Sequence, residues 1–452
     1  MTRIVIVGGG PAGYEAALVA VQLGAQVTLV ENEGVGGMCV LADCVPSKTL
    51  IATSEVMTSL AQADRVGVHN SGQVTAQVTE VHQRVKALAL AQSADIAARL
   101  TREGVTILYG AARLLPGRMV EVGSEVLTAD VILLATGAHP RVVVGAEPDG
   151  RRVLDWRQLY DLPALPEHLV VVGSGVTGAE FASAYLAMGC QVTLVSSRDR
   201  VLPSEDPDAA EQLQQVFVRR GMRVLRGRAQ SVESGDDGVV VRLVDGSSVA
   251  GSHCLMTVGS VPNTDGLGLE EAGVAVDDGG FITVDRVSRT TADGVYAAGD
   301  VTGVLMLASV AAMQGRIAMW HALGEAVAPL RLGTVAANVF TDPEVASVGV
   351  TQSQVDDGTV LARSLRLPLA TNARAKMQGI TDGFVKLFCR PGSGTILGGV
   401  VVAPRASELI LPISLAVQHG LTADQLAHTF AIYPSLSGSL TEAARQLMLH
   451  EV

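Results

Sequence analysis

The sequence predicts an α/β protein with two Rossmann-like dinucleotide-binding domains and a C-terminal α+β domain. Three observations predict this fold: a β-branched run followed by a glycine-rich turn at the N-terminus, the same pattern repeated near residue 170, and a change to alternating strands and then helices from about Gly333. The 452 residues suffice for two to four domains of roughly 100 to 200 residues. Glycine accounts for 49 of them, or about 11%, compared with a usual share of about 7%, which indicates many tight turns.

The first 31 residues form one complete dinucleotide-binding unit. Residues 4–7 are β-branched, as is typical of a strand buried on both faces of a parallel sheet. A helix over 14–23 and a strand over 26–30 follow, and this strand ends at Glu31, where an acid can accept hydrogen bonds from ribose hydroxyls. Between the first strand and the helix lie three glycines that turn the chain, admit a pyrophosphate and allow close packing: Gly8, Gly10 and Gly13.

The same unit recurs at residues 169–195, with a strand over 169–172, a helix over 179–188 and a strand over 191–195. One glycine pattern alone is weak, but two in complete strand, turn, helix and strand context indicate two dinucleotides, or one dinucleotide and one tightly held cofactor. The glycines of the second turn are Gly173, Gly175 and Gly178.

The residues after the strand over 191–195 bear on the choice of nucleotide. The strand does not end in an acid of the kind that binds a ribose 2′-hydroxyl and repels a 2′-phosphate. The arginines that follow could receive such a phosphate, so we predict that NADPH is used at least as well as NADH. In the alternative interpretation the arginines only solvate a loop. The residues concerned are Ser196, Ser197, Arg198 and Arg200.

Composition excludes several classes of function. The net charge of −12 argues against nucleic acid as a partner, and no apolar run approaches the length needed to cross a membrane. The start of the chain lacks the features of a secretory signal, so we expect a cytoplasmic protein. We expect no metal site, and five cysteines do not suggest a structural disulfide framework in a reducing compartment.

Two cysteines, Cys39 and Cys44, stand close together just after the first dinucleotide-binding unit. A loop this short is too small for a structural staple, so the pair is interpreted as a redox centre. A helix beginning near Cys44 and the positive charge of Lys48 would both lower the pKa of a thiolate. Cys190, Cys254 and Cys389 are interpreted as small buried hydrophobic residues.

Six motifs occur in an order that resembles the flavoprotein disulfide reductases, the class I pyridine nucleotide-disulfide oxidoreductases that include lipoamide dehydrogenase, glutathione reductase and soluble transhydrogenase. The resemblance spans the whole chain. Its motifs are the first glycine turn, the two cysteines with Lys48, Ala135-Thr-Gly137, the second glycine turn ending Gly178-Ala-Glu180, Tyr296-Ala-Ala-Gly-Asp300, and Val339-Phe-Thr-Asp-Pro-Glu-Val-Ala-Ser-Val-Gly349.

The resemblance implies an FAD-binding domain over 1–147, completed by a central segment over about 271–332. It further implies an NAD(P)-binding domain over 148–270 and a dimerisation domain over 333–452 that makes a homodimer. The FAD residues it implies are Gly8, Gly10, Gly13, Glu31, Gly37, Lys48, Gly110, Ala111, Thr136, Gly137, Asp300, Leu307 and Ala308. The NAD(P) residues it implies are Gly173, Gly175, Gly178, Glu180, Ser196, Ser197, Arg198, Arg200 and Gly259.

The resemblance also implies individual roles. Glu31 would hold the adenosine ribose, Gly110 and Ala111 would contact adenine, and Asp300 would bind the ribityl chain. The helix beginning at Leu307 and Ala308 would point its N-terminus at the flavin pyrimidine edge. Lys48 would pair with Glu180 beside the flavin, and the catalytic residues would be Cys39, Cys44, Lys48, Glu180 and Tyr433.

The chain departs from this family at the C-terminal motif. The family has a His-Pro-Thr-Leu-Ser-Glu type segment whose histidine passes protons to a thiol, whereas here the run is Tyr433-Pro-Ser-Leu-Ser-Gly438. A phenol ionises only near pH 10, so it cannot exchange protons readily at neutral pH. His419 and His428 lie outside the motif position, and the usual Asn-x-Gly between the cysteines is Leu41-Ala-Asp43.

An intact flavin site without this proton shuttle is similar to the actinobacterial NAD(P)H quinone reductase branch of the family. We therefore predict an FAD-dependent enzyme that passes electrons from NADPH or NADH to a small-molecule acceptor of the quinone type. The alternatives are a dihydrolipoamide dehydrogenase-like disulfide reductase that uses Cys39 and Cys44, a soluble pyridine nucleotide transhydrogenase, and a sensing flavoprotein that hardly turns over.

Overall fold

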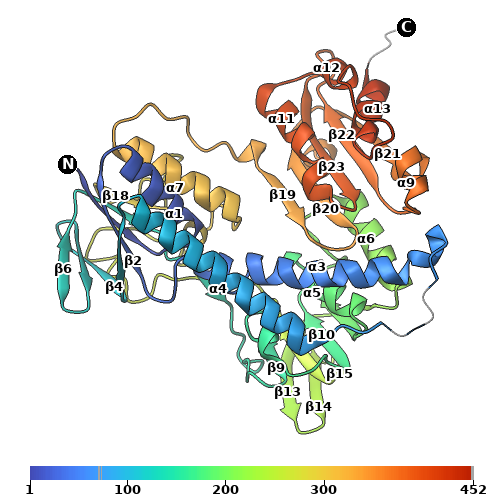
Figure 1. The fold of residues 1–452 in the computed structure, drawn as a ribbon, viewed down its shortest axis with the longest axis horizontal. Helices are drawn as coiled ribbons and strands as arrows, with labels where there is room; N and C mark the ends of the chain where they lie inside the picture. Colours follow the sequence, from blue (N-terminus) through green and yellow to red (C-terminus); the bar gives the residue numbers. More distant parts are fainter. Residues whose placement is uncertain (70–71, 73, 449–452) are drawn as a thin grey trace. The chain divides into compact units, whose positions relative to one another are not determined.

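The computed structural model describes residues 1–69, 72 and 74–448 (Figure 1). The chain divides into two compact units. Unit 1 comprises residues 1–49, 82–141 and 259–330, and unit 2 comprises residues 50–81, 142–258 and 331–452. The predicted division into FAD, NAD(P) and dimerisation ranges is a division by function, which this grouping by packing does not test.

Unit 1 is organised around a five-stranded parallel sheet. Its strand order is β18 (Val295–Ala297), β7 (Val131–Leu134), β1 (Arg3–Val7), β2 (Gln26–Glu31) and β3 (Thr106–Tyr109). Residues 4–7 are at most 4% exposed, as their β-branched run predicts. Ile6 packs into the core on one face of the sheet and Val7 into the core on the other, because side chains alternate along a strand.

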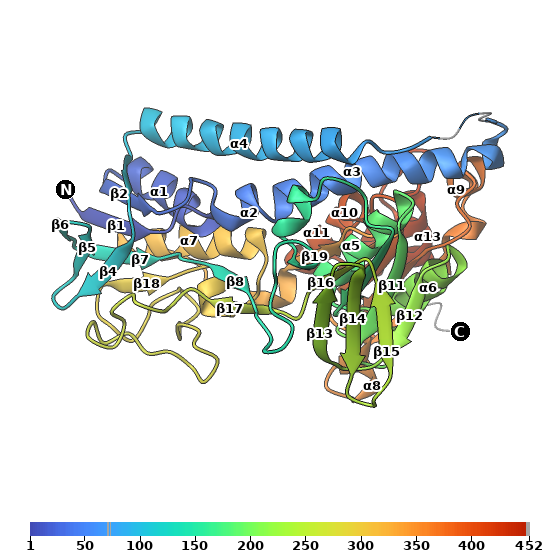
Figure 2. The ribbon, with the colours of Figure 1, turned by 90° about the horizontal axis from the view of Figure 1, so that it is seen from below.

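Helices α1 (Pro11–Gln22) and α7 (Ala308–Ala322) lie side by side in unit 1 (Figures 1 and 2). A Cβ on Gly315 would lie 2.2 Å from the carbonyl oxygen of Ala12, so only glycine permits this approach. An ion pair of 2.7 Å joins Arg316 Nη2 to Glu15 Oε2. Helix α1 begins at Pro11, three residues before the predicted start, because the fixed φ of proline suits the first turn of a helix.

The remaining elements of unit 1 are shorter, apart from a long helix. One small antiparallel sheet consists of β4 (Ala112–Leu115), β5 (Met119–Val122) and β6 (Glu125–Thr128). A second consists of β8 (Ala138–Pro140) and β17 (Ser260–Pro262). The helical elements are α2 (Gly37–Leu41), η3 (Asp300–Thr302), the start of α3 (Cys44–Ala61) and most of α4 (Val78–Arg102).

Unit 2 contains the second Rossmann-like sheet. Its order is β12 (Arg223–Arg226), β11 (Gln191–Ser196), β10 (His168–Val172), β16 (His253–Met256) and β9 (Val153–Asp155), all parallel. The associated elements are α5 (Val176–Ala187), α6 (Pro207–Arg219), η1 (Ala63–Val66) and η2 (Gln158–Asp161). A meander lies beside the sheet (Figure 2): β13 (Ala229–Gly235), β14 (Gly238–Leu243) and β15 (Ser248–Gly251).

The C-terminal part of unit 2 is an antiparallel sheet with helices, as the change after Gly333 predicts. The strand order is β19 (Ala336–Val339), β20 (Glu344–Gly349), β23 (Ile396–Ala403), β22 (Phe384–Cys389) and β21 (Arg363–Pro368). The helical elements are η4 (Leu332–Thr334), α8 (Gln352–Asp356), η5 (Leu369–Thr371), α9 (Ala373–Met377), α10 (Ala406–Leu409), α11 (Leu411–His419), α12 (Ala423–Ala427) and α13 (Gly438–Leu447).

A buried charge connects the C-terminal sheet of unit 2 to the start of helix α6. Lys386 of β22 is 3% exposed, and its Nζ lies 2.9 Å from Asp206 Oδ2 and 2.8 Å from Asp208 Oδ2. Asp206 also caps α6 by accepting from the backbone N–H of Asp208 and Ala209. The C-terminal sheet therefore holds the start of α6 in place.

The three lone cysteines are buried, as predicted, and Cys254 and Cys389 lie in strands. Within the described residues, we find no helix that combines the length and apolarity needed to span a membrane.

Candidate cofactor and nucleotide sites

The first glycine turn, Gly8 to Gly13, has the geometry that its sequence predicts. Gly8 has a φ of +105°, and a Cβ there would lie 2.3 Å from the carbonyl oxygen of Ala135. A Cβ on Gly13 would lie 1.9 Å from the carbonyl oxygen of Gly8. Gly10 precedes helix α1 and faces open space, which is what the approach of a pyrophosphate to a helix N-terminus requires.

Glu31 is buried at the end of β2 and fixes the loop around the turn. Its Oε2 accepts a hydrogen bond from the backbone N–H of Gly9 at 2.6 Å. Its Oε1 accepts from three successive backbone N–H groups, those of Asn32, Glu33 and Gly34. The carboxylate is thus held at the strand end, where a ribose is bound in Rossmann units.

Gly37 and Gly110 lie close to the first turn and to Glu31. Gly37 begins α2 with a φ of +57°, and a Cβ there would lie 2.9 Å from Gly10 Cα. The backbone N–H of Gly110 donates to the carbonyl of Glu31 at 2.9 Å. Gly110 and the adjoining Ala111 therefore lie beside the carboxyl end of β2. The structure therefore brings these predicted FAD residues together in unit 1.

Thr136 and Gly137 are braced by Asn263, which the sequence analysis missed. The Thr136 hydroxyl donates to the Asn263 carbonyl at 2.7 Å, and Asn263 Nδ2 donates to the Thr136 carbonyl at 2.8 Å. Asn263 Oδ1 lies 2.6 Å from His139 Nδ1, and its backbone N–H donates to Gly137. The available signal was the Val-Pro-Asn run shortly after Gly259, another predicted residue, which lies in unit 1 with a φ of +96°.

Asp300 and the start of α7 form the other end of the predicted flavin site. Asp300 opens η3, and burial together with the charge of Asp43 raises the pKa of its carboxyl group to about 6. Helix α7 begins at Ala308 after Leu307, as predicted, and its N-terminus carries partial positive charge. The buried amide of Gln314 accepts from the backbone N–H of Gly299 at 2.9 Å and so holds the segment before Asp300.

Cys39 and Cys44 lie within hydrogen-bonding contact of each other, on α2 and at the first residue of α3. The hydrogen bond to Cys44 raises the pKa of the Cys39 thiol, and burial and the charges of Asp43 and Asp300 raise it further. Cys44 occupies the helix N-terminus that the sequence predicts, where the helix dipole favours a thiolate. The pair is therefore asymmetric, with the proton favoured on Cys39.

The second glycine turn, Gly173 to Gly178, repeats the first. Gly173 has a φ of +112°, and a Cβ there would lie 2.2 Å from the Thr257 carbonyl oxygen. A Cβ on Gly178 would lie 1.9 Å from the Gly173 carbonyl oxygen, whereas Gly175 precedes α5 and faces open space. Unit 2 thus has a second complete glycine turn with the geometry of the first.

Ser196 takes the place at the end of β11 that Glu31 takes at the end of β2. Its hydroxyl is buried and lies 2.7 Å from the hydroxyl of Ser174 in the glycine turn. It also contacts the backbone carbonyls of Arg198 and Arg200 at 3.0 and 3.2 Å. The backbone of the arginine loop is therefore fixed, while Ser197 and Arg198 are exposed.

Glu180 is buried in α5 and faces the C-terminal sheet within unit 2. It is 3% exposed, and its Oε1 accepts from the backbone N–H of Phe340 at 2.8 Å. Lys48 lies in α3 within unit 1. The predicted pairing of Lys48 with Glu180 therefore stays a prediction.

Tyr433 lies on an exposed loop between α12 and α13. It is 84% exposed, and Phe430 and Ile432 on the same loop are 103% and 82% exposed. Gly438 begins α13, and its backbone N–H donates to Ser435 Oγ at 3.2 Å. Gly438, which stands where the family has a glutamate, thus supplies no carboxylate. The polar groups at this position are its backbone and the hydroxyls of neighbouring serines.

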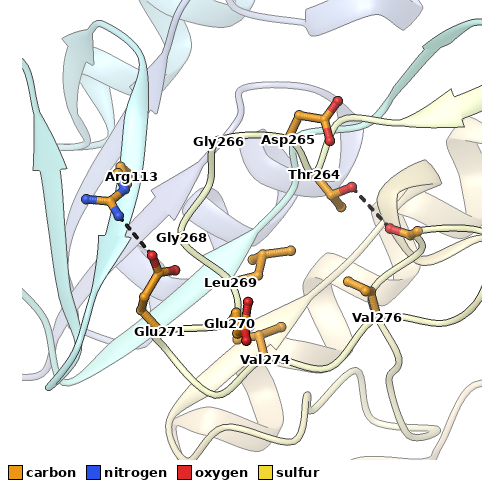
Figure 3. Close-up of a pocket in the computed structure, with 11 residues that line it drawn as sticks. Arg113, Thr264, Asp265, Gly266, Gly268, Leu269, Glu270, Glu271, Val274 and Val276 are labelled. Atoms are coloured by element: carbon orange, nitrogen blue, oxygen red, sulfur yellow. Dashed lines mark hydrogen bonds and ion pairs between the residues drawn. The ribbon is translucent and has the colours of Figure 1, made fainter.

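A hollow of about 640 Å³ in unit 1 lies outside the predicted sites (Figure 3). Arg113 and Glu271 form an ion pair of 3.1 Å across its rim, and the Thr264 hydroxyl donates to the Gly280 carbonyl. None of the residues lining it is a predicted site residue.

Comparison with known proteins identifies the family. Residues 2–315 match the model of the pyridine nucleotide-disulphide oxidoreductases, and residues 335–444 match the dimerisation domain of the same group. The chain belongs to the pyridine nucleotide-disulphide oxidoreductase family. The predicted family, fold class and enzyme class, a flavoprotein oxidoreductase that uses NAD(P)H, are confirmed, and the dimerisation domain supports the predicted homodimer.

The chain is 57% identical to an NAD(P)H dehydrogenase (quinone) of Mycobacterium tuberculosis, with 100% of this chain and 95% of that protein covered. It is 36% identical to a dihydrolipoyl dehydrogenase of Chlorobaculum tepidum, with 98% and 96% covered. The crystal structure of LpdA from Mycobacterium tuberculosis matches with a TM-score of 0.95 and 57% identity, covering 99% of this chain and 100% of that one. The HOCl-induced flavoprotein disulfide reductase RclA from Escherichia coli matches with a TM-score of 0.88 and 26% identity, covering 98% and 99%.

Proposed function

We propose that this chain is an FAD-dependent NAD(P)H:quinone oxidoreductase. The overall reaction is NAD(P)H plus H⁺ plus quinone giving NAD(P)⁺ plus hydroquinone. One observation carries the proposal: both phosphate-binding turns are complete, whereas Tyr433 and Gly438 replace the histidine and glutamate that pass protons to a thiol. The 57% identity to a protein named NAD(P)H dehydrogenase (quinone) supports the same acceptor.

The residues of unit 1 fit FAD. The open space at Gly10 admits a pyrophosphate against the N-terminus of α1, and the Glu31 carboxylate stands where it can hold the adenosine ribose. Asp300 opens η3 and would bind the ribityl chain, and the N-terminus of α7 would favour negative charge at the pyrimidine edge. Bound FAD would supply the means to take two electrons from a reduced nicotinamide and release them to an acceptor.

The second glycine turn and Ser196 support NADPH as a donor. Strand β11 ends in the neutral hydroxyl of Ser196, so the strand end itself carries no carboxylate that would repel a 2′-phosphate. Ser196 fixes the backbone of the loop that carries Arg198 and Arg200, and guanidinium groups bind phosphate with good geometry. We therefore propose NADPH as the preferred or an equal donor.

A second candidate function is disulfide reduction by Cys39 and Cys44. The contact between their side chains favours it, because a pair that close can exchange a disulfide. Reduction of an external disulfide also needs a proton for each departing thiolate. Tyr433 offers a phenol in place of the family's imidazole, so quinone reduction, which requires no thiol leaving group, is the better-supported function.

An anaerobic experiment separates the two functions. The purified protein with its flavin is reduced with NADPH and then mixed with menadione or with lipoamide while the flavin absorbance is followed. We expect rapid reoxidation by menadione alone. Rapid reoxidation by lipoamide alone would refute the proposal in favour of a disulfide reductase.

Two variants sharpen this result. Cys44→Ser should retain quinone reduction, since the proposed acceptor uses no thiol. The double change Tyr433→His with Gly438→Glu restores the family's residues, and a Cβ at Gly438 meets only Ser435 Oγ, at 3.8 Å. We expect this double variant to gain lipoamide reduction. Loss of quinone reduction in Cys44→Ser would contradict the proposal.

A further inference from the structure

Strand β12 pairs with β11 and carries an arginine, Arg226, beside the end of β11. This is the end at which the ribose of a Rossmann-bound nucleotide lies. In the parallel pairing of β11 with β12, Arg226 is the cross-strand partner of Ser196. The next backbone N–H, that of Gly227, donates to the Ser196 carbonyl at 2.8 Å. Because the ribose of a Rossmann-bound nucleotide lies at the carboxyl end of the second strand, Arg226 stands next to it.

Arg226 is held by an acid from the loop that follows β11. Its Nη2 lies 2.5 Å from Asp199 Oδ1, and the two side chains are 76% and 78% exposed. Exposed ion pairs contribute little to stability, so this pair has no structural task that requires it. Ser196 contacts the backbone carbonyls on both sides of Asp199, those of Arg198 and Arg200, and thereby fixes where the Asp199 side chain begins.

We propose that Arg226 is a specificity-determining residue that binds the 2′-phosphate of NADPH, and that Asp199 holds it at the ribose position when no phosphate is bound. The inference rests on the nucleotide part of the proposed function and is independent of the acceptor. It assigns phosphate recognition to β12 as well as to the loop after β11.

The physical argument is a competition between two anions for one guanidinium group. A 2′-phosphate carries more negative charge and more acceptor oxygens than a carboxylate, so it displaces Asp199 from Arg226. Asp199 then faces the phosphate as a like charge and lowers its affinity. With NADH no phosphate is present, and the Asp199 to Arg226 pair remains.

Binding of oxidised nucleotides to the holoenzyme tests this inference without any acceptor. Calorimetric titrations with NADP⁺ and with NAD⁺ are compared for wild type, Arg226→Gln and Asp199→Asn. We expect Arg226→Gln to weaken NADP⁺ binding about tenfold more than NAD⁺ binding, since loss of one charged hydrogen bond has about that effect on affinity. Asp199→Asn should instead strengthen NADP⁺ binding relative to NAD⁺ binding.

Arg242→Gln is the matched control. Arg242 forms an exposed ion pair with Glu233 at 2.9 Å, but on the meander sheet of unit 2. This variant should bind both nucleotides like wild type. Raising the salt concentration should weaken NADP⁺ binding more in wild type than in Arg226→Gln, because the charge that salt screens is absent from the variant.

The outcomes separate this inference from the proposed function. The inference is overturned if Arg226→Gln loses affinity equally for NADP⁺ and NAD⁺, or loses none. Quinone reduction is measured independently, so this outcome leaves the proposed acceptor unaffected. A selective loss of NADP⁺ supports it even if menadione proves to be no acceptor. A wild-type protein that binds NAD⁺ but not NADP⁺ overturns both the inference and the proposed choice of donor.

Discussion

The two glycine turns have nearly the same backbone and different surroundings. Gly8 and Gly173 have φ values of +105° and +112°, and in both turns a Cβ on the last glycine would lie 1.9 Å from a carbonyl oxygen of the first. The strand that follows ends in Glu31 in one unit and in Ser196 in the other. The comparison teaches that two strand ends with different side chains can share one turn backbone, and under the proposed function the turn would hold phosphate while the strand end would select the ribose.

The largest expected effect comes from breaking each turn separately. Gly13→Ala and Gly178→Ala each place a methyl group 1.9 Å from a backbone oxygen, so the turn must distort. We expect Gly13→Ala to be purified without flavin. Gly178→Ala should stay yellow but lose at least about 100-fold in the rate of flavin reduction by NADPH, as misplacement of a reacting group by about 1 Å does.

Gly333→Ala serves as the control for both changes, because a Cβ there meets nothing within 4 Å. Flavin content is measured by absorbance and reduction by stopped flow under anaerobic conditions. Loss of flavin from Gly178→Ala would show that the turns are not independent, contrary to the comparison.

A second prediction converts the strand end of unit 2 into that of unit 1. In unit 1 the Glu31 carboxylate accepts from Gly9, whereas in unit 2 the Ser174 and Ser196 hydroxyls contact each other. The double change Ser174→Gly with Ser196→Glu should lower kcat/KM for NADPH by about 100-fold relative to NADH, since the carboxylate repels the 2′-phosphate. Ser174→Gly alone is the control, and an unchanged preference in the double variant would refute the role of the strand end.

A third prediction weakens the strand end of unit 1. Glu31→Gln retains the shape but loses the charge, and its amide nitrogen cannot accept from the backbone N–H groups that the two carboxylate oxygens serve. Leaving one donor unpaired costs about 1–3 kcal/mol. We expect FAD affinity to fall by about tenfold and the melting temperature to decrease, measured by flavin release and calorimetry. The exposed neighbour Glu33 provides the control Glu33→Gln, which should change neither quantity.

The sequence predicts those parts of the fold and site that depend on neighbours along the chain. The strand over residues 4–7 and the turn from Gly8 to Gly13 follow from local patterns, since β-branched runs and positive φ have direct physical causes. Cys39 and Cys44 are close in the sequence, and their contact was predicted for the same reason.

Other parts depend on residues distant along the chain, and the sequence does not reveal them. Asn263 braces Thr136 across 127 positions, and Arg226 reaches Ser196 only through the register of β11 with β12. The position of Glu180 against Phe340 likewise follows from packing within unit 2. The surroundings of Tyr433 in a dimer depend on a second chain, so its role stays a prediction.

The smallest expected effect concerns the cysteines that follow the strand end in unit 1 and have no counterpart after β11. The hydrogen bond to Cys44 and burial raise the pKa of the Cys39 thiol above its ordinary value. A raised pKa keeps this thiol protonated at neutral pH, so in the reduced protein its alkylation should be slower at pH 7 than that of an ordinary cysteine. The rate should rise with pH and level off only above the pH at which an ordinary thiol does, because thiolate is the reactive form.

Cys44→Ala removes the hydrogen bond, which is the largest cause of the raised pKa, so it should speed the alkylation of Cys39 at pH 8 and make the rate level off at lower pH. Peptide mass spectrometry after timed exposure to iodoacetamide measures each cysteine separately. Cys254 is the internal reference, since burial raises the pKa of its thiol to about 12 and its surroundings do not include Cys44. A wild-type Cys39 whose alkylation levels off below pH 8 would mean that this thiol ionises readily. It could then attack an external disulfide near neutral pH, which would favour disulfide reduction over the proposed quinone reduction.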